Sequence, residues 1–246
     1  MNKTNKFVTK TIEIFRKNGI EINDNRLSSG FGLDDNCAEE CVLILGLNPA
    51  GNENDAKNAR NNRDKPYLFS LETSNYHDLT YNTYFRPIYE FVNQVLEEGG
   101  KWSWCNKSRE FIKKTFDDDP IILKEFDKNK DKRYTIHVGD MFYYHQTNSK
   151  LLTDKLNGNE RYSMALEILN DHIDYLVGHN RKIKFVYINN ATVSKWLTNE
   201  SHETFQLINN IPVFYGGMLS GQRSMDNFSK ERLIQEIKTY FKKAKE

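Results

Sequence analysis

Short, continuously apolar runs alternate along the chain with longer stretches whose apolar residues recur at helical spacing. Residues 41–45 (CVLIL) are too short and too uniformly apolar for a surface helix, so they predict a buried, parallel strand. Further stretches are strand candidates because they are rich in β-branched and aromatic residues: residues 134–144, 182–190 and 211–217.

Amphipathic stretches lie around these strands. Residues 7–18 predict a helix that ends at Gly19. Further helices are expected at residues 84–100, 161–179, 191–197 and 227–246. Strands that alternate with helices predict an α/β fold, here a three-layer α/β/α domain with a central, mostly parallel four-stranded sheet. We expect a single domain over residues 1–246, in which residues 1–35 form an N-terminal helical extension.

The carboxyl ends of the strands are the expected place for a ligand site in such a sheet. Stretches that leave strands begin at Asn48, Asp140 and Met218. At the first, two flanking glycines permit unusual backbone angles and Pro49 stiffens the turn, which holds Asn48 at the sheet edge with its amide oxygen and nitrogen available. The alternative is that Asn48 only caps the next turn through its own backbone bonds.

Charge and cysteine content narrow the class of protein. The 35 Lys and Arg residues against 34 Asp and Glu residues give a net charge of +1, which excludes an overall basic coat but leaves room for a local basic groove. The 3 cysteines lack CxxC spacing and the histidines lack ligand spacing, so we expect reduced thiols, no metal and no cofactor. His172 lies on an apolar helical stripe and is interpreted as a core histidine.

The chain has no apolar run of membrane-span length, and its first residues lack the apolar segment of a signal peptide. We therefore expect a cytoplasmic protein that does not contact a membrane and that is a monomer.

The order of strand, Gly-x-Asn-Pro and glycine resembles the first motif of the uracil-DNA glycosylase superfamily, particularly its mismatch-specific and single-strand-selective branches. That motif reads Gly-x-Asn-Pro-Gly, and this chain has Ala50 before Gly51. The resemblance implies that Asn48 holds the water that attacks the sugar C1′, and that Leu47 beside it contacts the base. A helix start similar to the family's Asn-x-Phe-Trp motif matches at Asn82, Tyr84, Phe85 and Ile88.

A third similarity lies at the loop before the last helix, where the family has His-Pro-Ser or Asn-Pro-Ser. Ser220 and Gly221 match it, which implies a catalytic role for Ser220, whereas Met218 and Leu219 depart from it. A thioether is a weak acceptor and cannot support the negative charge of a departing base. Either another group supplies that contact, with His137 and His145 as candidates, or the activity is altered, or a shift in register brings Ser220, Arg223 or Ser224 to the loop tip.

Asp140 stands where the family carries its base-reading residue, usually Asn. An ionised Asp only accepts hydrogen bonds, so it would face the O4 of uracil unfavourably and would accept from an exocyclic amine. This points to a cytosine-like or adenine-like base. The alternative is that Asp140 is a turn or cap residue after Gly139.

A flipped base also needs aromatic contacts and phosphate contacts. Phe69, and after it Tyr67, lies at the distance from the first motif where the family places its stacking aromatic. The basic residues Lys57, Arg60, Arg63 and Lys65 share that loop, and Arg223 lies across the predicted cleft with Gly221. They either contact DNA phosphates or form a solvated face, just as each aromatic is either a base platform or part of the core.

The resemblance implies a single uracil-DNA glycosylase-like domain, a monofunctional DNA glycosylase that acts on a flipped, amino-bearing or modified base. DNA is the expected partner, in repair of DNA damage or in phage defence. Two alternatives remain. One is an N-glycosyl hydrolase of free nucleosides or nucleotides, and the other is a catalytically lapsed DNA- or protein-binding module of the same fold.

Overall fold

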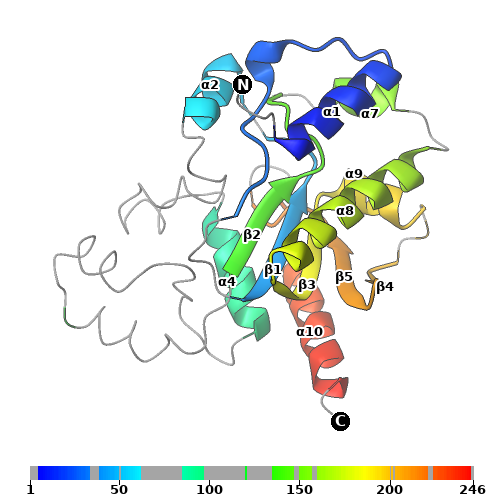
Figure 1. The fold of residues 1–246 in the computed structure, drawn as a ribbon. Coiled ribbons are helices and arrows are strands. Elements are labelled where there is room, and N and C mark those ends of the chain that lie inside the picture. The colour runs from blue at the N-terminus through cyan, green and yellow to red at the C-terminus, as the bar shows by residue number, and fades with distance from the viewer. Residues whose placement is uncertain are drawn as a thin grey trace.

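The centre of the fold is a five-stranded, mostly parallel β-sheet (Figure 1). This computed structural model describes residues 5–33, 39–49, 51–61, 85–96, 120, 135–146, 150–156, 160–199, 201, 203–220 and 224–244. The strands are β1 (Glu40–Gly46), β2 (Thr135–Asp140), β3 (Lys182–Asn189), β4 (Phe205–Ile208) and β5 (Ile211–Gly216). They lie in the order β2-β1-β3-β5-β4, and β4 pairs antiparallel with β5 while the neighbouring pairs β2-β1, β1-β3 and β3-β5 are parallel.

The expectation of four strands is wrong because it misses β4. This edge strand is only 4 residues long, and Gln206 interrupts its apolar residues, so it lacks the longer continuous apolar run that marks β1. Asn209 and Asn210 both have positive φ, 53° and 63°, as a two-residue hairpin turn between β4 and β5 requires. Asparagine tolerates this conformation, so the pair Asn-Asn before β5 was the available signal.

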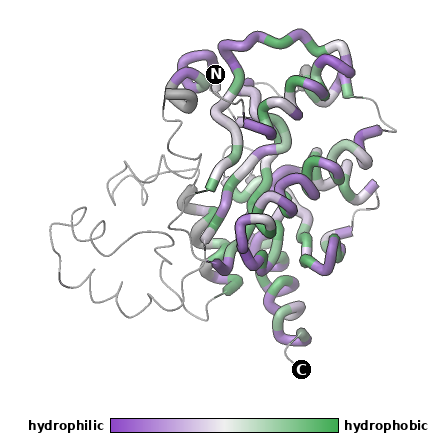
Figure 2. Tube along the Cα trace, in the orientation of Figure 1, coloured by the Kyte–Doolittle hydropathy of each residue, from purple (hydrophilic) through white to green (hydrophobic). Residues whose placement is uncertain are grey.

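The helices of the described residues are α1 (Lys6–Lys17), the 3-10 helix η1 (Asp24–Arg26), α2 (Glu53–Asn61), α4 (Phe85–Leu96), α7 (Lys150–Lys155), α8 (Arg161–Gly178), α9 (Ala191–Leu197) and α10 (Asn227–Lys243). Five of them lie where the sequence predicts them, namely α1, α4, α8, α9 and α10, whereas η1, α2 and α7 were not predicted. Hydrophilic and hydrophobic positions alternate along α10, as expected of a helix with one buried face (Figure 2). Within the described ranges, no helix is both long and apolar enough to cross a membrane.

Alternate residues of the strands enter two separate core clusters. In β1, Leu43 and Leu45 pack in the first cluster with residues of α1, α8 and α9, whereas Val42 and Ile44 pack in the second with residues of α4 and α10. Successive side chains of a strand point to opposite faces, so the two clusters lie on the two faces of the sheet and helices flank both.

The N-terminal helix α1 is part of the first core cluster. Asn5 caps it by accepting a hydrogen bond from the Phe7 backbone N–H, and Gly19, with φ of 62°, follows its end. Phe15 is fully buried and its ring lies 5.5 Å from the ring of Phe142 and 5.3 Å from that of Tyr144, both beyond the end of β2. α1 therefore supports the loop that leaves β2.

Truncation of Phe15 should reveal this support. We expect Phe15→Ala to lower the free energy of unfolding by about 3–5 kcal/mol, because it deletes a buried ring from a packed core. Phe228→Ala is the matched control, since Phe228 is 81% exposed, and it should change stability by less than about 0.5 kcal/mol. Urea unfolding of both variants measures the difference, and equal costs would mean that α1 does not contribute to the core.

Candidate active site

Four strands bring their carboxyl ends to one edge of the sheet. Gly46 of β1 is the register partner of Asp140 of β2, and Asn189 of β3 is the partner of Gly216 of β5. The strand order reverses between β1 and β3, because β2 lies on one side of β1 and β3 on the other. In an open parallel sheet, ligands bind in the crevice at such a reversal.

Backbone hydrogen bonds join the exits of β1 and β2. The N–H groups of Met141, Phe142 and Gln146 donate to the carbonyls of Gly46, Leu47 and Pro49, at 3.0, 2.9 and 3.1 Å respectively. The two loops therefore extend the parallel pairing of their strands beyond the sheet. A side chain on either loop is held relative to the other loop.

Asn48 lies within this joined pair of loops, and its side-chain nitrogen faces backbone carbonyls. Nδ2 donates to the carbonyl oxygens of Pro49, Gln146 and Tyr144, at 3.1, 3.2 and 3.4 Å. Carbonyls only accept, so these contacts fix which end of the amide is nitrogen. Oδ1 is left as an acceptor without a donor among the described residues. Asn48 is thus more than a local cap, because two of its three contacts go to the other loop.

Asp140 is buried, with 4% of its surface exposed, and its carboxylate accepts no hydrogen bond in the part of the chain that the structure describes. Its side chain leans over Gly46, since a Cβ at residue 46 would lie 2.5 Å from the Asp140 Oδ1. Burial raises the pKa of Asp140 to about 7. The carboxylate does not act as a cap, and near neutral pH it exists in both protonation states. The assumption that Asp140 only accepts therefore holds above pH 7 and fails below it.

A hydrogen-bonded chain runs from Asp140 into the core. The Asp140 N–H donates to the Tyr143 hydroxyl at 3.3 Å, and that hydroxyl lies 3.0 Å from Nε2 of His172. Nδ1 of His172 donates to the Ile168 carbonyl at 2.8 Å, so Nε2 accepts and Tyr143 donates to it. Burial lowers the pKa of His172 to about 4, which keeps the ring neutral. The interpretation of His172 as a core histidine is confirmed.

The exit of β5 is tied to β3 through Asn189, which the sequence analysis missed. Oδ1 of Asn189 accepts from the Leu219 N–H at 2.8 Å, and Asn189 is 2% exposed. Met218 forms a bridge with Ser224 and is half-buried, while Ser220 is buried and its Oγ has no hydrogen-bond partner within the described ranges. The available signal was position, because Asn189 lies one residue before the end of the strand predicted at residues 182–190.

Two predicted residues point away from this edge. His137 lies on the opposite face of β2 from Asp140, with its ring 6.0 Å from that of Phe31, and burial lowers its pKa to about 3. The side chain of Leu47 is buried in the first core cluster. His137 is therefore not placed to compensate for Met218, and Leu47 is not placed to contact a base through its side chain.

His145 lies on the β2 exit between the two residues whose carbonyls hold Asn48. Its backbone N–H donates to the Arg26 carbonyl at 2.7 Å, and its ring is buried. The structure thus brings His145, Asn48 and Asp140 onto one pair of loops.

Other predicted site residues lie outside the described residues. They are Tyr67, Phe69, Arg63, Lys65, Gly221 and Arg223, together with the motif residues Asn82 and Tyr84. Arg60 belongs to α2, but its side chain is not described, and Lys57 is exposed on the same helix. Their roles stay predictions.

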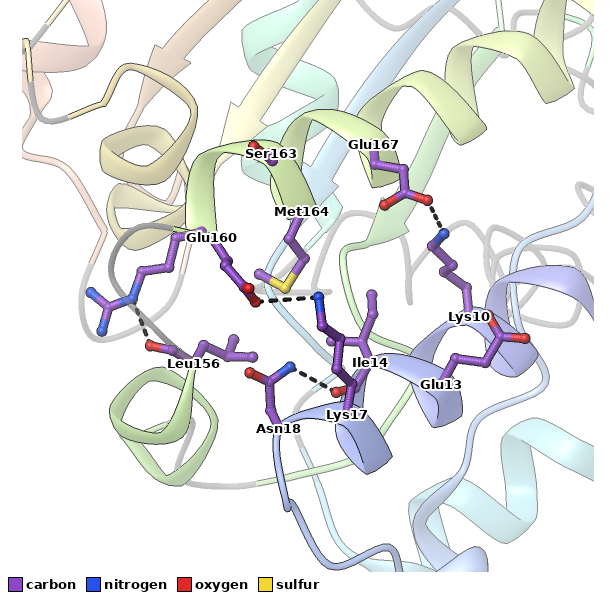
Figure 3. Close-up of a pocket in the computed structure, with 11 residues that line it drawn as sticks. Lys10, Glu13, Ile14, Lys17, Asn18, Leu156, Glu160, Ser163, Met164 and Glu167 are labelled. Atoms are coloured by element: carbon purple, nitrogen blue, oxygen red, sulfur yellow. Dashed lines mark hydrogen bonds and ion pairs between the residues drawn. The ribbon is translucent and has the colours of Figure 1, made fainter.

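A hollow of about 470 Å³ lies elsewhere, between α1, α7 and α8 (Figure 3). Four of its charged side chains form ion pairs, Lys17 with Glu160 at 3.3 Å and Lys10 with Glu167. None of the predicted site residues lines it. We interpret it as a groove between packed helices, separate from the strand-exit site.

Comparison of the chain with protein-family models and with curated proteins finds no match. The assignment of a function therefore rests on the chemistry of the strand exits.

The raised pKa of Asp140 predicts how stability depends on pH. In the unfolded chain this carboxyl loses its proton near pH 4, whereas in the folded protein it does so near pH 7, so folding becomes less favourable as pH rises between these values. Asp140→Asn cannot ionise. Relative to wild type, we expect its free energy of unfolding to rise between pH 4 and pH 7, by roughly 1–4 kcal/mol, and then to stay level.

Denaturant unfolding at pH 4, 6 and 8 measures this difference. Asp174→Asn is the matched control, because Asp174 is exposed on α8 and undergoes the same chemical change. Its difference from wild type should not vary over this range. A pH-independent difference for Asp140→Asn would show that the Asp140 carboxyl is not desolvated.

Proposed function

We propose that the protein is a monofunctional DNA glycosylase that hydrolyses the N-glycosidic bond of a flipped base, as its resemblance to the uracil-DNA glycosylase superfamily implies. The observation that most supports this proposal is the orientation of the Asn48 amide. Its nitrogen donates to three backbone carbonyls, which fixes its oxygen as an acceptor. The proposal includes a three-layer, glycosylase-like domain over residues 1–246, with DNA as its partner.

The chemistry follows from this fixed acceptor. Oδ1 of Asn48 accepts a hydrogen bond from a water molecule, which directs a lone pair of that water toward the sugar C1′. As the bond between C1′ and the base nitrogen breaks, its electron pair leaves with the base and the sugar becomes oxocarbenium-like. The water oxygen then bonds to C1′ and loses a proton to solvent. Such a reaction needs little activation of the water, so positioning and electrostatics carry the rate.

Asp140 is the proposed base reader beside this water. When ionised it accepts a hydrogen bond from an exocyclic amine, and when protonated it also donates, as an asparagine does. Phe69 or Tyr67 is the proposed stacking partner, with Ser220 and His145 completing the polar site. Arg60, Arg63, Lys65, Gly221 and Arg223 are the proposed DNA contacts. The role in repair or in defence against modified phage DNA is part of the same proposal.

Met218 favours a second candidate, a DNA- or protein-binding module of the same fold without activity. Its thioether stands where the resemblance places a polar group that contacts the departing base. Its backbone carbonyl already accepts a hydrogen bond from the Met225 N–H at 2.8 Å. The two candidates differ in whether base is released.

Incubation with duplexes and single strands that carry modified bases separates these candidates. We expect alkali-labile abasic sites at one class of base. Salt-dependent binding to DNA without abasic sites would instead favour the binding module, and base release from free nucleosides but not from oligonucleotides would favour a nucleoside hydrolase.

Asn48→Ala tests whether the fixed amide of Asn48 contributes to base release. We expect base release to fall by at least about 100-fold, because a positioned group of this kind typically contributes that much. Asn54→Ala is the matched control, since Asn54 is exposed on α2, and its rate should stay within about twofold of wild type. Single-turnover rates of abasic-site formation provide the measurement. A folded Asn48→Ala protein with wild-type rates would remove Asn48 from the mechanism.

A further inference from the structure

The last residues of β2, β1 and β3 lie on the same face of the sheet. Val138, Ile44 and Tyr187 lie in the second core cluster, and each stands two residues before a strand end. Because side chains alternate along a strand, Asp140, Gly46 and Asn189 share that face. Asp140 and Asn189 therefore flank Gly46 from the two neighbouring strands.

Between the two side chains lies Gly46, over which the Asp140 carboxylate leans. Neighbouring strands lie about 4.8 Å apart, so the backbones of Asp140 and Asn189 are about 10 Å apart across β1. Gly46 contributes no side chain to the space between them. A planar ring at this edge would meet Asp140 from one strand and Asn189 from the other.

The hydrogen bonds of Asn189 fix the direction of its donors. Its Oδ1 is engaged by the Leu219 N–H at 2.8 Å, which turns the Nδ2 group away from that loop. Nδ2 meets no acceptor among the residues that the structure describes, and only 2% of the surface of Asn189 is exposed. Nδ2 is thus a donor that the described part of the protein leaves available at this strand exit.

A second unpaired polar group lies at the same exit. Ser220 directly follows Leu219, is 2% exposed, and its Oγ has no hydrogen-bond partner within the described ranges. The residue that donates to the Asn189 amide is thus followed directly by a buried hydroxyl without a partner among the described residues. Two polar groups withheld from the protein's own hydrogen bonds at one strand exit indicate a ligand that carries acceptor atoms.

We propose that Asn189 is a second base-contacting residue, which donates from Nδ2 to a carbonyl oxygen or ring nitrogen of the flipped base opposite Asp140. This inference rests on the proposed function and extends the base site from β2 across Gly46 to β3. When the bond to C1′ breaks, negative charge collects on such acceptor atoms of the base, and a fixed donor stabilises it. Asn189 thereby supplies the polar contact that Met218 cannot supply.

Asn189→Asp separates this role from a structural one. Aspartate has the same shape and keeps an oxygen for the Leu219 N–H, but its second oxygen replaces the donor Nδ2. Asn189→Leu removes both groups. Asn190→Asp is the matched control, because Asn190 caps α9 through Oδ1, at 2.9 Å from the Thr192 N–H, and aspartate caps a helix equally well.

Binding is measured with single strands that carry 2′-fluoro-cytidine, 2′-fluoro-uridine or a tetrahydrofuran abasic residue at one position. The fluorine destabilises an oxocarbenium ion, so these strands report recognition without chemistry. The affinity for a strand that carries the base, divided by the affinity for the strand with the abasic residue, isolates the contacts to the base. We expect Asn189→Asp and Asn189→Leu to lower this ratio by about tenfold or more for the better-bound base, while Asn190→Asp leaves it unchanged.

The outcomes are distinguishable from those for the proposed function. An unchanged ratio in Asn189→Asp overturns the inference even if wild type releases base from DNA. If the ratio falls in Asn189→Leu but not in Asn189→Asp, the inference is also overturned. The hydrogen bond from the Leu219 N–H, which Asn189→Asp keeps, would then explain the effect. An Asn189-dependent ratio in a protein that releases no base supports the inference and contradicts the glycosylase. A wild-type protein with no preference for base over abasic strands overturns the inference as well.

Discussion

The joining of the β1 and β2 exits is the constraint on which the rest of the site depends. A parallel pair normally ends where its strands end, but here the backbone bonds continue through Met141, Phe142 and Gln146. Those bonds bring the carbonyls of Tyr144 and Gln146 to the Asn48 amide. Without them Asn48 would be an ordinary turn residue. Asp140 leans over Gly46 at the end of the same pair of strands, so one stretch of backbone pairing holds the Asn48 amide and the Asp140 carboxylate relative to each other.

Burial gives Asp140 its chemical character, and its backbone is held in place by elements far away in the chain. α1 packs Phe15 against the β2 exit, and Thr11 of the same helix accepts from the Tyr143 N–H at 3.0 Å. Tyr143 in turn holds the Asp140 backbone through a hydroxyl whose donor goes to a neutral His172. The core polar chain is satisfied internally, which leaves the Asp140 carboxylate as the group that faces the site. The polar groups inside the core thus hold the Asp140 backbone in position, whereas the carboxylate at the sheet edge keeps its capacity to form hydrogen bonds.

The four parallel strands and the helices α1, α4, α8, α9 and α10 could be predicted from the sequence because each has an apolar pattern of its own. The short elements η1, α2, α7 and β4 were not predicted, and β4, with four residues, is too short for an alternating pattern to stand out. For the candidate site, Asn48 and Asp140 were singled out by motif and by strand exit. Asn189 was missed because only the exits at Asn48, Asp140 and Met218 were considered, and the exit of the strand at residues 182–190 was not. His137 and Leu47 were misplaced because a one-residue step along a strand reverses the face, which only the register decides.

The contact between Thr11 and the Tyr143 backbone spans 132 residues of sequence, and it has a consequence for synthesis of the chain. A ribosome adds residues from the amino end, so α1 emerges long before its partners in β2 and α8 exist. Its apolar face has to remain exposed until they follow, and closing so long a loop costs chain entropy before any contact repays it. α1 can therefore dock only after β2 and α8 have been made, and the loop that leaves β2 gains its final shape only then.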